Sequence, residues 1–241
     1  MTSDPFIHHP ALRGLIADPF ASGWRRFTMA ELDARLTAMG LPTDWHYAED
    51  QIRAAFDSYL AQLPDQDLWI FAYGSLMWDP GFGFAEVRYG AVPGFGRRFI
   101  LKDIHGGRGT ADRPGLMAAL DQGQGCNGLL FRMARADLAA ELWMLWRREM
   151  LAPAYLPVLI PVDTARGAVT ALTFVADPAA PVLDRRLSRA DQVRFIATGV
   201  GFLGTSLQYL ENIAAQFAAL QIDDPEVTDL LAEVKAFLAV P

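Results

Sequence analysis

Residues 68–81 read Leu68-Trp69-Ile70-Phe71-Ala72-Tyr73-Gly74-Ser75-Leu76-Met77-Trp78-Asp79-Pro80-Gly81, and this stretch decides the fold. Its first five residues are apolar and include aromatic and β-branched side chains. Turn-forming residues precede and follow them. The pattern predicts a buried strand that breaks abruptly at Gly74.

The break after this strand allows two interpretations. Gly74 can adopt backbone angles closed to other residues and lets a ligand approach the main chain. The backbone N–H groups around Gly74 and Ser75 are then free to form an anion-binding nest. The alternative is an ordinary turn into Asp79-Pro80-Gly81, because Gly-Ser is a common pair after a strand. These residues alone leave both interpretations open.

The composition indicates a globular protein with a sizeable core. The chain has 241 residues, of which 52% are hydrophobic and 20% charged, and this excludes a disordered chain. Its apolar runs are shorter than the roughly 20 residues of a membrane span, and we expect neither a secretory signal nor a membrane partner. A single cysteine, Cys126, cannot form an internal disulfide, so we expect a cytoplasmic protein. With a net charge of −7 and dispersed arginine pairs, nucleic acid is not an expected partner.

Two helices are predicted ahead of the opening strand. Thr28 and Glu31 have the spacing of a capping box, and Gly40 ends that first helix. The second helix is predicted over residues 48–63. We therefore divide the chain into an N-terminal helical extension, residues 1–66, and a main domain, residues 67–241. The extension contains three of the four histidines, but no second ligand cluster at metal-site spacing accompanies them, so we expect no metal site.

The main domain is predicted to mix strands and helices. Strands are expected over 85–91, 97–101, 116–120, 126–131, 155–162 and 168–175, and helices over 137–149, 188–197, 206–220 and 225–238. Residues 105–115 are so rich in glycine that we predict a surface or lid loop, with His105 and Arg108 as candidate site residues.

Glu149 is an unusual residue for its position. It ends an amphipathic helix just before Pro153, where the helix dipole disfavours a carboxylate. A solvated or arginine-paired acid is one interpretation. The other is a desolvated carboxyl with a raised pKa, which can serve as a base. Cys126 is interpreted as a small core residue, and a Ser75 hydrolase is disfavoured because Ser75 lacks Gly-x-Ser-x-Gly flanks.

Several segments together resemble the ChaC-type γ-glutamylcyclotransferase family. They are Trp69–Trp78 with Pro80-Gly81-Phe82, Pro93–Phe99, His105–Gly115, Leu145–Met150 and Gly199–Leu210. The resemblance covers about residues 67 to 238 and implies an α+β fold, a small mixed β-barrel or strongly curved sheet surrounded by helices. It also implies cleavage of glutathione to 5-oxoproline and cysteinylglycine, with no metal or organic cofactor.

The resemblance also implies roles for particular residues. Glu149 matches the family's catalytic glutamate, a general acid and base. The glutamyl-binding loop is matched by four consecutive residues, Tyr73, Gly74, Ser75 and Leu76, and Tyr209 matches a tyrosine whose hydroxyl donates to the substrate. Two alternatives stay open: a cyclotransferase for another γ-glutamyl amine or peptide, and a non-catalytic γ-glutamyl-binding regulatory module. The retained Glu149 argues against the second, because a pure binder gains nothing from an acid at a helix C-terminus.

Overall fold

The computed structural model describes residues 4–240. The N-terminal part contains short 3-10 helices at Pro10–Leu12 (η1) and Gly23–Arg25 (η2), followed by α1 (Met29–Ala38) and α2 (Glu49–Leu60). The predicted capping box is confirmed. The Thr28 hydroxyl accepts a hydrogen bond from the Glu31 N–H, and the Glu31 carboxylate accepts one from the Thr28 N–H.

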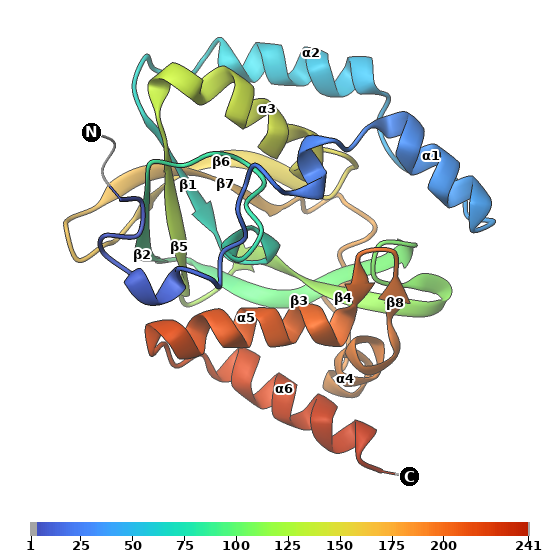
Figure 1. Cartoon of the computed structure of the whole chain (residues 1–241). Helices are drawn as coiled ribbons and strands as arrows, with labels where there is room; N and C mark the ends of the chain where they lie inside the picture. The colour runs from blue at the N-terminus through green and yellow to red at the C-terminus, as the bar shows by residue number, and fades with distance from the viewer. Residues whose placement is uncertain (1–3, 241) are drawn as a thin grey trace.

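A mixed seven-stranded sheet forms the centre of the molecule (Figure 1). Its hydrogen-bonded order is β2-β5-β1-β7-β4-β3, and β6 pairs with β7. The strands are β1 (Leu68–Ala72), β2 (Glu86–Val92), β3 (Phe95–His105), β4 (Thr110–Gln122), β5 (Cys126–Met133), β6 (Tyr155–Val162) and β7 (Val169–Ala176). The predicted opening strand is therefore an interior strand, antiparallel to β5 and parallel to β7.

The sheet curls back on itself. Ala91 near the end of β2 and Asp163 just after β6 exchange two backbone hydrogen bonds of 2.8 and 2.9 Å. This bridge brings the edge strand β2 close to β6, the strand that pairs with β7. The predicted strongly curved mixed sheet surrounded by helices is confirmed, although the sheet is not a closed barrel.

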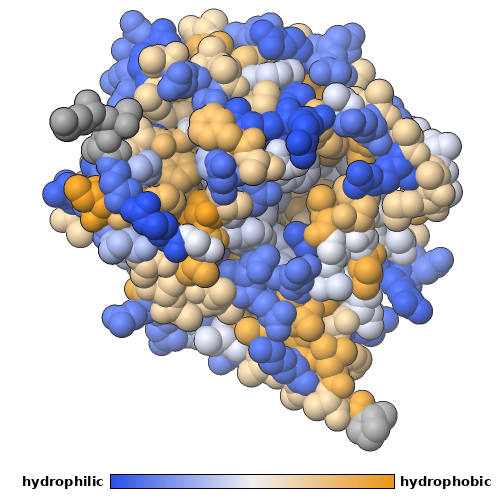
Figure 2. Space-filling model, in the orientation of Figure 1, coloured by the Kyte–Doolittle hydropathy of each residue, from blue (hydrophilic) through white to orange (hydrophobic). Residues whose placement is uncertain are grey.

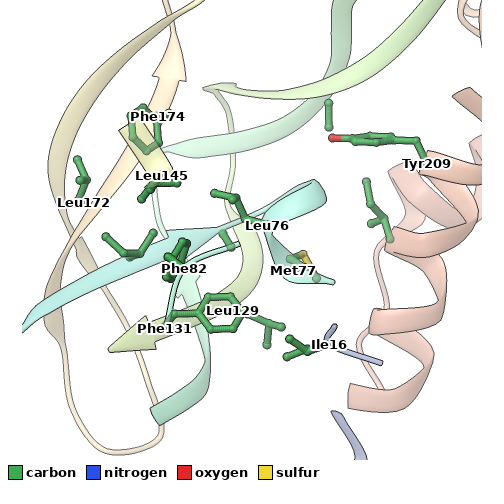
Figure 3. Packing of buried hydrophobic residues seen from close by; sticks show 14 of the residues in the cluster. Ile16, Leu76, Met77, Phe82, Leu129, Phe131, Leu145, Leu172, Phe174 and Tyr209 are labelled. Carbon is green, nitrogen blue, oxygen red and sulfur yellow. The ribbon is translucent and has the colours of Figure 1, made fainter. Parts of the chain in front are cut away.

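Helices cover the sheet on two sides (Figure 1). α3 (Leu138–Glu149) and α2 lie on one side, and α4 (Arg189–Thr198), α5 (Ser206–Leu220) and α6 (Pro225–Leu238) lie on the other. Between them is a continuous apolar core, part of which Figure 3 shows, with Phe82 and Phe131 near its centre.

The N-terminal helices share this core with the main sheet. Ile52 and Phe56 of α2 are almost fully buried. Phe56 and Tyr59 pack on Trp146 of α3, with ring centroids 6.0 and 4.8 Å apart. Burial of large aromatic side chains dominates the energetics of such a contact. The boundary at residues 66 and 67 stays a prediction, and it coincides with the start of β1.

The prediction of a loop over residues 105–115 is right only for residues 106–109 and wrong for residues 110–115, which belong to β4. β3 continues to His105 and β4 begins at Thr110, which pairs with it, so the turn is short. Gly109 and Gly115 allow close packing of backbone on backbone. A Cβ on Gly109 would lie 1.9 Å from the Gly115 nitrogen, and one on Gly199 would lie 2.5 Å from the Gly115 Cα.

The glycine-broken turn predicted over residues 198–205 is a minimal hairpin. Two-residue strands, β8 (Val200–Gly201) and β9 (Gly204–Thr205), pair antiparallel and pack against the β3–β4 turn. Phe202 and Leu203 donate backbone hydrogen bonds of 2.9 and 2.8 Å to the carbonyls of Gly106 and Gly107. The hairpin therefore fixes the start of α5.

Hydrophilic side chains are spread over the face seen in Figure 2, interspersed with apolar ones. Near the C-terminus the exposed apolar side chains include Phe237 and Leu238 of α6. Among residues 4–240, no helix combines the length and the hydropathy needed to cross a membrane.

Candidate active site

A pocket opens where β1 ends. It encloses about 320 Å³, its open mouth included, and its walls come from β1, β4, β6, β7, α3 and α5. All six site residues predicted from the sequence line it: Tyr73, Gly74, Ser75, Leu76, Glu149 and Tyr209. The remaining lining residues are Phe71, Ala118, Tyr155 and Phe174.

The loop after β1 presents free backbone donors to this pocket. Ser75–Met77 form a 3-10 helix, η3, with Gly74 at its N-cap. The Met77 N–H bonds the Gly74 carbonyl at 2.9 Å, but the N–H groups of Ser75 and Leu76 donate to no acceptor among the described residues. The first N–H groups of a helix have no internal partner, so these two are available to a carboxylate or a developing oxyanion.

Gly74 is required by a close approach. Its φ is −133°, so it does not use the left-handed region. A Cβ at this position would lie 2.6 Å from the hydroxyl oxygen of Tyr209. Figure 3 shows the Tyr209 side chain reaching from α5 toward the sheet, and Thr205 caps the start of that helix. A glycine can be needed here for its backbone angles or for a close approach of another group, and the geometry supports the close approach.

Glu149 is both paired with an arginine and largely desolvated. It is the last residue of α3, and its side chain is only 14% exposed. Burial raises the pKa of its carboxyl, while the Arg148 guanidinium, whose Nε lies 3.2 Å from Glu149 Oε1, opposes that shift. A carboxyl with a raised pKa exchanges protons more readily near neutral pH than an ordinary surface acid does.

The tyrosines around Glu149 remain protonated near neutral pH. Burial raises the pKa of Tyr73 and of Tyr155 well above the usual tyrosine range, and it raises the pKa of Tyr209 to about 12. The Tyr73 hydroxyl donates to the Phe174 carbonyl at 2.9 Å, which fixes its ring. The hydroxyls of Tyr155 and Tyr209 are therefore suited to donate hydrogen bonds, whereas that of Tyr73 is already committed to Phe174. Glu149 is the carboxylic acid among the residues lining the pocket.

Sequence reasoning missed two groups at the site. Tyr155 lines the pocket from the first position of β6, and its strand pattern carried no signal of this. Arg148 donates to the Ser75 hydroxyl oxygen at 2.7 Å, whereas in the sequence it is one of the dispersed arginine pairs. The available signal was its position directly before Glu149.

Other candidate residues lie elsewhere. His105 stacks on Trp45 with ring centroids 4.6 Å apart, outside the pocket lining. Arg108 is buried, donates to the Thr205 carbonyl at 2.9 Å and places its guanidinium 5.1 Å from the centre of the Tyr209 ring. Arg108 therefore packs behind the pocket wall.

Nucleophile and metal alternatives find little support. Each of the four histidines bonds or stacks outside the pocket, with Glu86, Tyr89, Asp33 and Trp45 as the respective partners of His8, His9, His46 and His105. Ser75 therefore has no imidazole base in the pocket lining. The Cys126 side chain is buried, and burial raises the pKa of its thiol. Across residues 4–240, the side chains form no group of three or more metal-ligating residues.

The curved sheet and its pocket define a class: an enzyme-like α+β fold in which one buried carboxylic acid and the loop of Ser75 and Leu76, whose N–H groups have no acceptor among the described residues, line the same pocket. The model of the ChaC-like protein family matches residues 68–237, and the chain belongs to this family. It is 37% identical to the glutathione-specific gamma-glutamylcyclotransferase of Escherichia coli K12, over 80% of this chain and 84% of that protein.

Relatives in other organisms agree with this assignment. The human glutathione-specific gamma-glutamylcyclotransferase 1 is 31% identical over 74% of this chain and 85% of its own length. A solved structure of a yeast gamma-glutamyl cyclotransferase specific to glutathione matches the fold with a TM-score of 0.66. It has 17% identity and covers 71% of this chain and 97% of the yeast chain.

Proposed function

We propose that this protein is a γ-glutamylcyclotransferase that cleaves glutathione to 5-oxoproline and cysteinylglycine, with Glu149 as its general acid and base. The burial of one carboxyl in the pocket that Ser75 and Leu76 also line, with their N–H groups free of acceptors among the described residues, carries the proposal. Family membership and the names of the relatives support it.

The reaction needs a base but no enzyme nucleophile. Glu149 accepts a proton from the α-amino group of the γ-glutamyl unit. That nitrogen attacks its own side-chain carbonyl, and a C–N bond closes the five-membered ring. The amide bond to cysteine then breaks, and the proton returns from Glu149 to the leaving amine. Atoms and charge balance without a cofactor or water.

The loop from Tyr73 to Leu76 is proposed to bind the charges of the substrate. Its free N–H groups hold either the α-carboxylate or the oxyanion that develops on the attacked carbonyl. The tyrosine hydroxyl of Tyr209, which approaches Gly74 closely, donates a hydrogen bond to the same unit. By holding the glutamyl chain folded onto itself, the pocket lowers the entropic part of the activation barrier, because attack within one molecule is fast once the geometry is enforced.

The residues outside the γ-glutamyl site determine which leaving amine the pocket accepts, and hence the substrate. Against the pattern of the family that the sequence resembles, this chain has Pro153-Ala154 before Tyr155 in place of a glycine and lacks a Ser-Gly-Pro in residues 199–204. We propose glutathione as the substrate, and the same base also allows another γ-glutamyl amine. The proposal includes a cytoplasmic setting, because one cysteine cannot form an internal disulfide.

Incubation of the purified protein with glutathione tests the function. We expect 5-oxoproline and cysteinylglycine in equal amounts. γ-Glutamylcysteine and γ-glutamylalanine are tested at the same concentration. If 5-oxoproline forms from these compounds but not from glutathione, the substrate is another γ-glutamyl amine. Binding of γ-glutamyl compounds without any product contradicts the enzyme and supports the regulatory module.

A further inference from the structure

Arg148 contacts both sides of the pocket. Its Nη2 donates to the Ser75 hydroxyl oxygen at 2.7 Å, and its Nη1 donates to the Asp79 carbonyl at 2.5 Å. Its Nε lies 3.2 Å from Glu149 Oε1. One side chain therefore joins the loop after β1 to the carboxyl at the end of α3, two segments that the chain itself does not hold together.

The shape of the guanidinium allows one side chain to make these contacts at the same time. It is planar and directs its N–H groups in fixed directions, so its two acceptors, the Ser75 hydroxyl and the Asp79 carbonyl, must keep one arrangement while its charge lies beside the Glu149 carboxyl. The Arg148 side chain is only 7% exposed, and bonds to a charged donor are strong in such surroundings. A lysine at this position keeps the charge but lacks the planar fork that bonds the Ser75 and Asp79 oxygens together.

The N-terminal extension covers the other face of this group. The Arg148 guanidinium carbon lies 4.8 Å from the centre of the Trp24 ring. The segment carrying Trp24 is fastened to α3, because Arg147 Nη1 donates to the Phe27 carbonyl at 2.9 Å. A cation held against an aromatic face is stabilised and shielded from water. The extension lies outside the residues that the family model matches, yet it reaches the site through Trp24.

We propose that Arg148 is a positioning residue that holds Glu149 and the Ser75 loop in one fixed arrangement, and that Trp24 of the N-terminal extension shields its guanidinium from water. The inference rests on the proposed function, since it assigns how that site is kept in order. It gives part of the N-terminal extension a role in the reaction.

The charges that face Glu149 make the pH profile informative. Tyr73, Tyr155 and Tyr209 are neutral near pH 7, so the Arg148 charge is the contact that opposes the raised pKa of Glu149. Arg148→Gln removes this charge and the pKa of Glu149 rises further. The ascending limb of kcat/KM against pH then moves to higher pH. Arg148→Lys keeps the charge, so the limb stays near its wild-type position while kcat falls.

Steady-state kinetics on glutathione separates the two contributions. We expect kcat to fall about 10²-fold in both Arg148 variants, while KM changes by less than about threefold, because misplacing a reacting group costs turnover more than binding. Arg185→Gln is the matched control, since Arg185 also donates to a carboxylate, that of Asp121, but lies outside the pocket lining. Wild-type kcat in Arg148→Lys overturns the proposal, and so does an unshifted limb in Arg148→Gln.

The Trp24 part of the proposal has its own test. Trp24→Ala is expected to lower kcat about tenfold, and Trp24→Phe, which keeps an aromatic face, is expected to retain most of it. Trp45→Ala is the control, because Trp45 stacks on His105 instead. Full activity in Trp24→Ala overturns the shielding role.

A measurement without turnover separates this proposal from the function. The pKa of Glu149 is followed by ¹³C NMR in glutamate-labelled wild type, Arg148→Gln and Arg185→Gln, each first checked for a cooperative thermal transition. An upward shift confined to Arg148→Gln supports the positioning role even if no γ-glutamyl compound is turned over. Equal pKa values in all three proteins overturn it, whatever the activity.

Discussion

Two glycine-containing regions of this protein use the missing side chain differently. At Gly74 an added Cβ would meet the Tyr209 hydroxyl, the end of a side chain that lines the pocket. At Gly109 and Gly199 it would meet the backbone of Gly115 and its neighbours. The first region leaves space beside a ligand site, and the second lets main chain pack on main chain. A glycine in a sequence therefore does not reveal which of the two it serves.

The largest effect is expected from Glu149→Gln, which removes the proposed base without changing the size of the side chain. The amide cannot take the amine proton, so 5-oxoproline formation should fall about 10³- to 10⁴-fold, while folding and γ-glutamyl binding remain. Product analysis and calorimetric titration with glutathione measure both. Glu211→Gln, an exposed acid paired with Lys235, is the control. An active Glu149→Gln excludes Glu149 as the base.

Gly109→Ala tests the packing side of the comparison. Its Cβ would lie 1.9 Å from a backbone nitrogen, and backbone cannot move aside as a flexible side chain can. We expect a loss of about 4 kcal/mol or more in the free energy of unfolding, with activity lost because the fold is lost. Urea denaturation measures it, and Gly23→Ala, with open space at its Cβ, serves as the reference. Equal stability of the two variants would falsify the backbone-packing interpretation.

Gly74→Ala tests the ligand side. The nearest atom is the Tyr209 hydroxyl oxygen, and the ring carbon behind it is at an ordinary 3.7 Å. We expect kcat/KM to fall about 10²-fold with a modest loss of stability.

Combining Gly74→Ala with Tyr209→Phe sharpens this prediction. Removing the hydroxyl relieves the contact, so the stabilities of the two substitutions should be non-additive by about 1 kcal/mol. Strict additivity in urea denaturation of the four proteins would show that the Tyr209 hydroxyl does not limit position 74.

The smallest effect concerns stability against pH. Burial raises the folded-state pKa of Glu149, so the folded state binds this proton more tightly than the unfolded chain does. The wild type should therefore lose stability as the pH rises from the ordinary carboxyl range through the raised pKa, and Glu149→Gln should not. Melting temperatures at pH 4.5 and pH 8 measure this. The melting temperature of Glu149→Gln minus that of the wild type should be a few degrees larger at pH 8 than at pH 4.5. A difference that does not change with pH contradicts a raised pKa.

Much of the molecule followed from local signals in the sequence. The strand at 68–72, the capping box at Thr28 and the helices over 206–220 and 225–238 are set by periodicity and caps, which act within a few residues. The break after β1 and the acid at a helix C-terminus are local irregularities too, but each left two interpretations open, and the site roles, with Tyr209 among them, came from the resemblance to the ChaC-type family. The catalytic roles remain a proposal.

Tertiary structure alone decided the rest. The sequence does not tell whether residues 105–115 are a loop, because their close contacts form only once β3 pairs with β4: a Cβ on Gly109 would meet the backbone of Gly115 and of Asp103 across the turn, and a Cβ on the distant Gly199 would meet Gly115. The part of Arg148 was hidden for the same reason, since its acceptors at Ser75 and Asp79 are about 70 residues away. Local propensity shapes each element, whereas the meeting of Glu149, the Ser75 loop and Tyr209 in one pocket depends on how the curled sheet brings distant segments together.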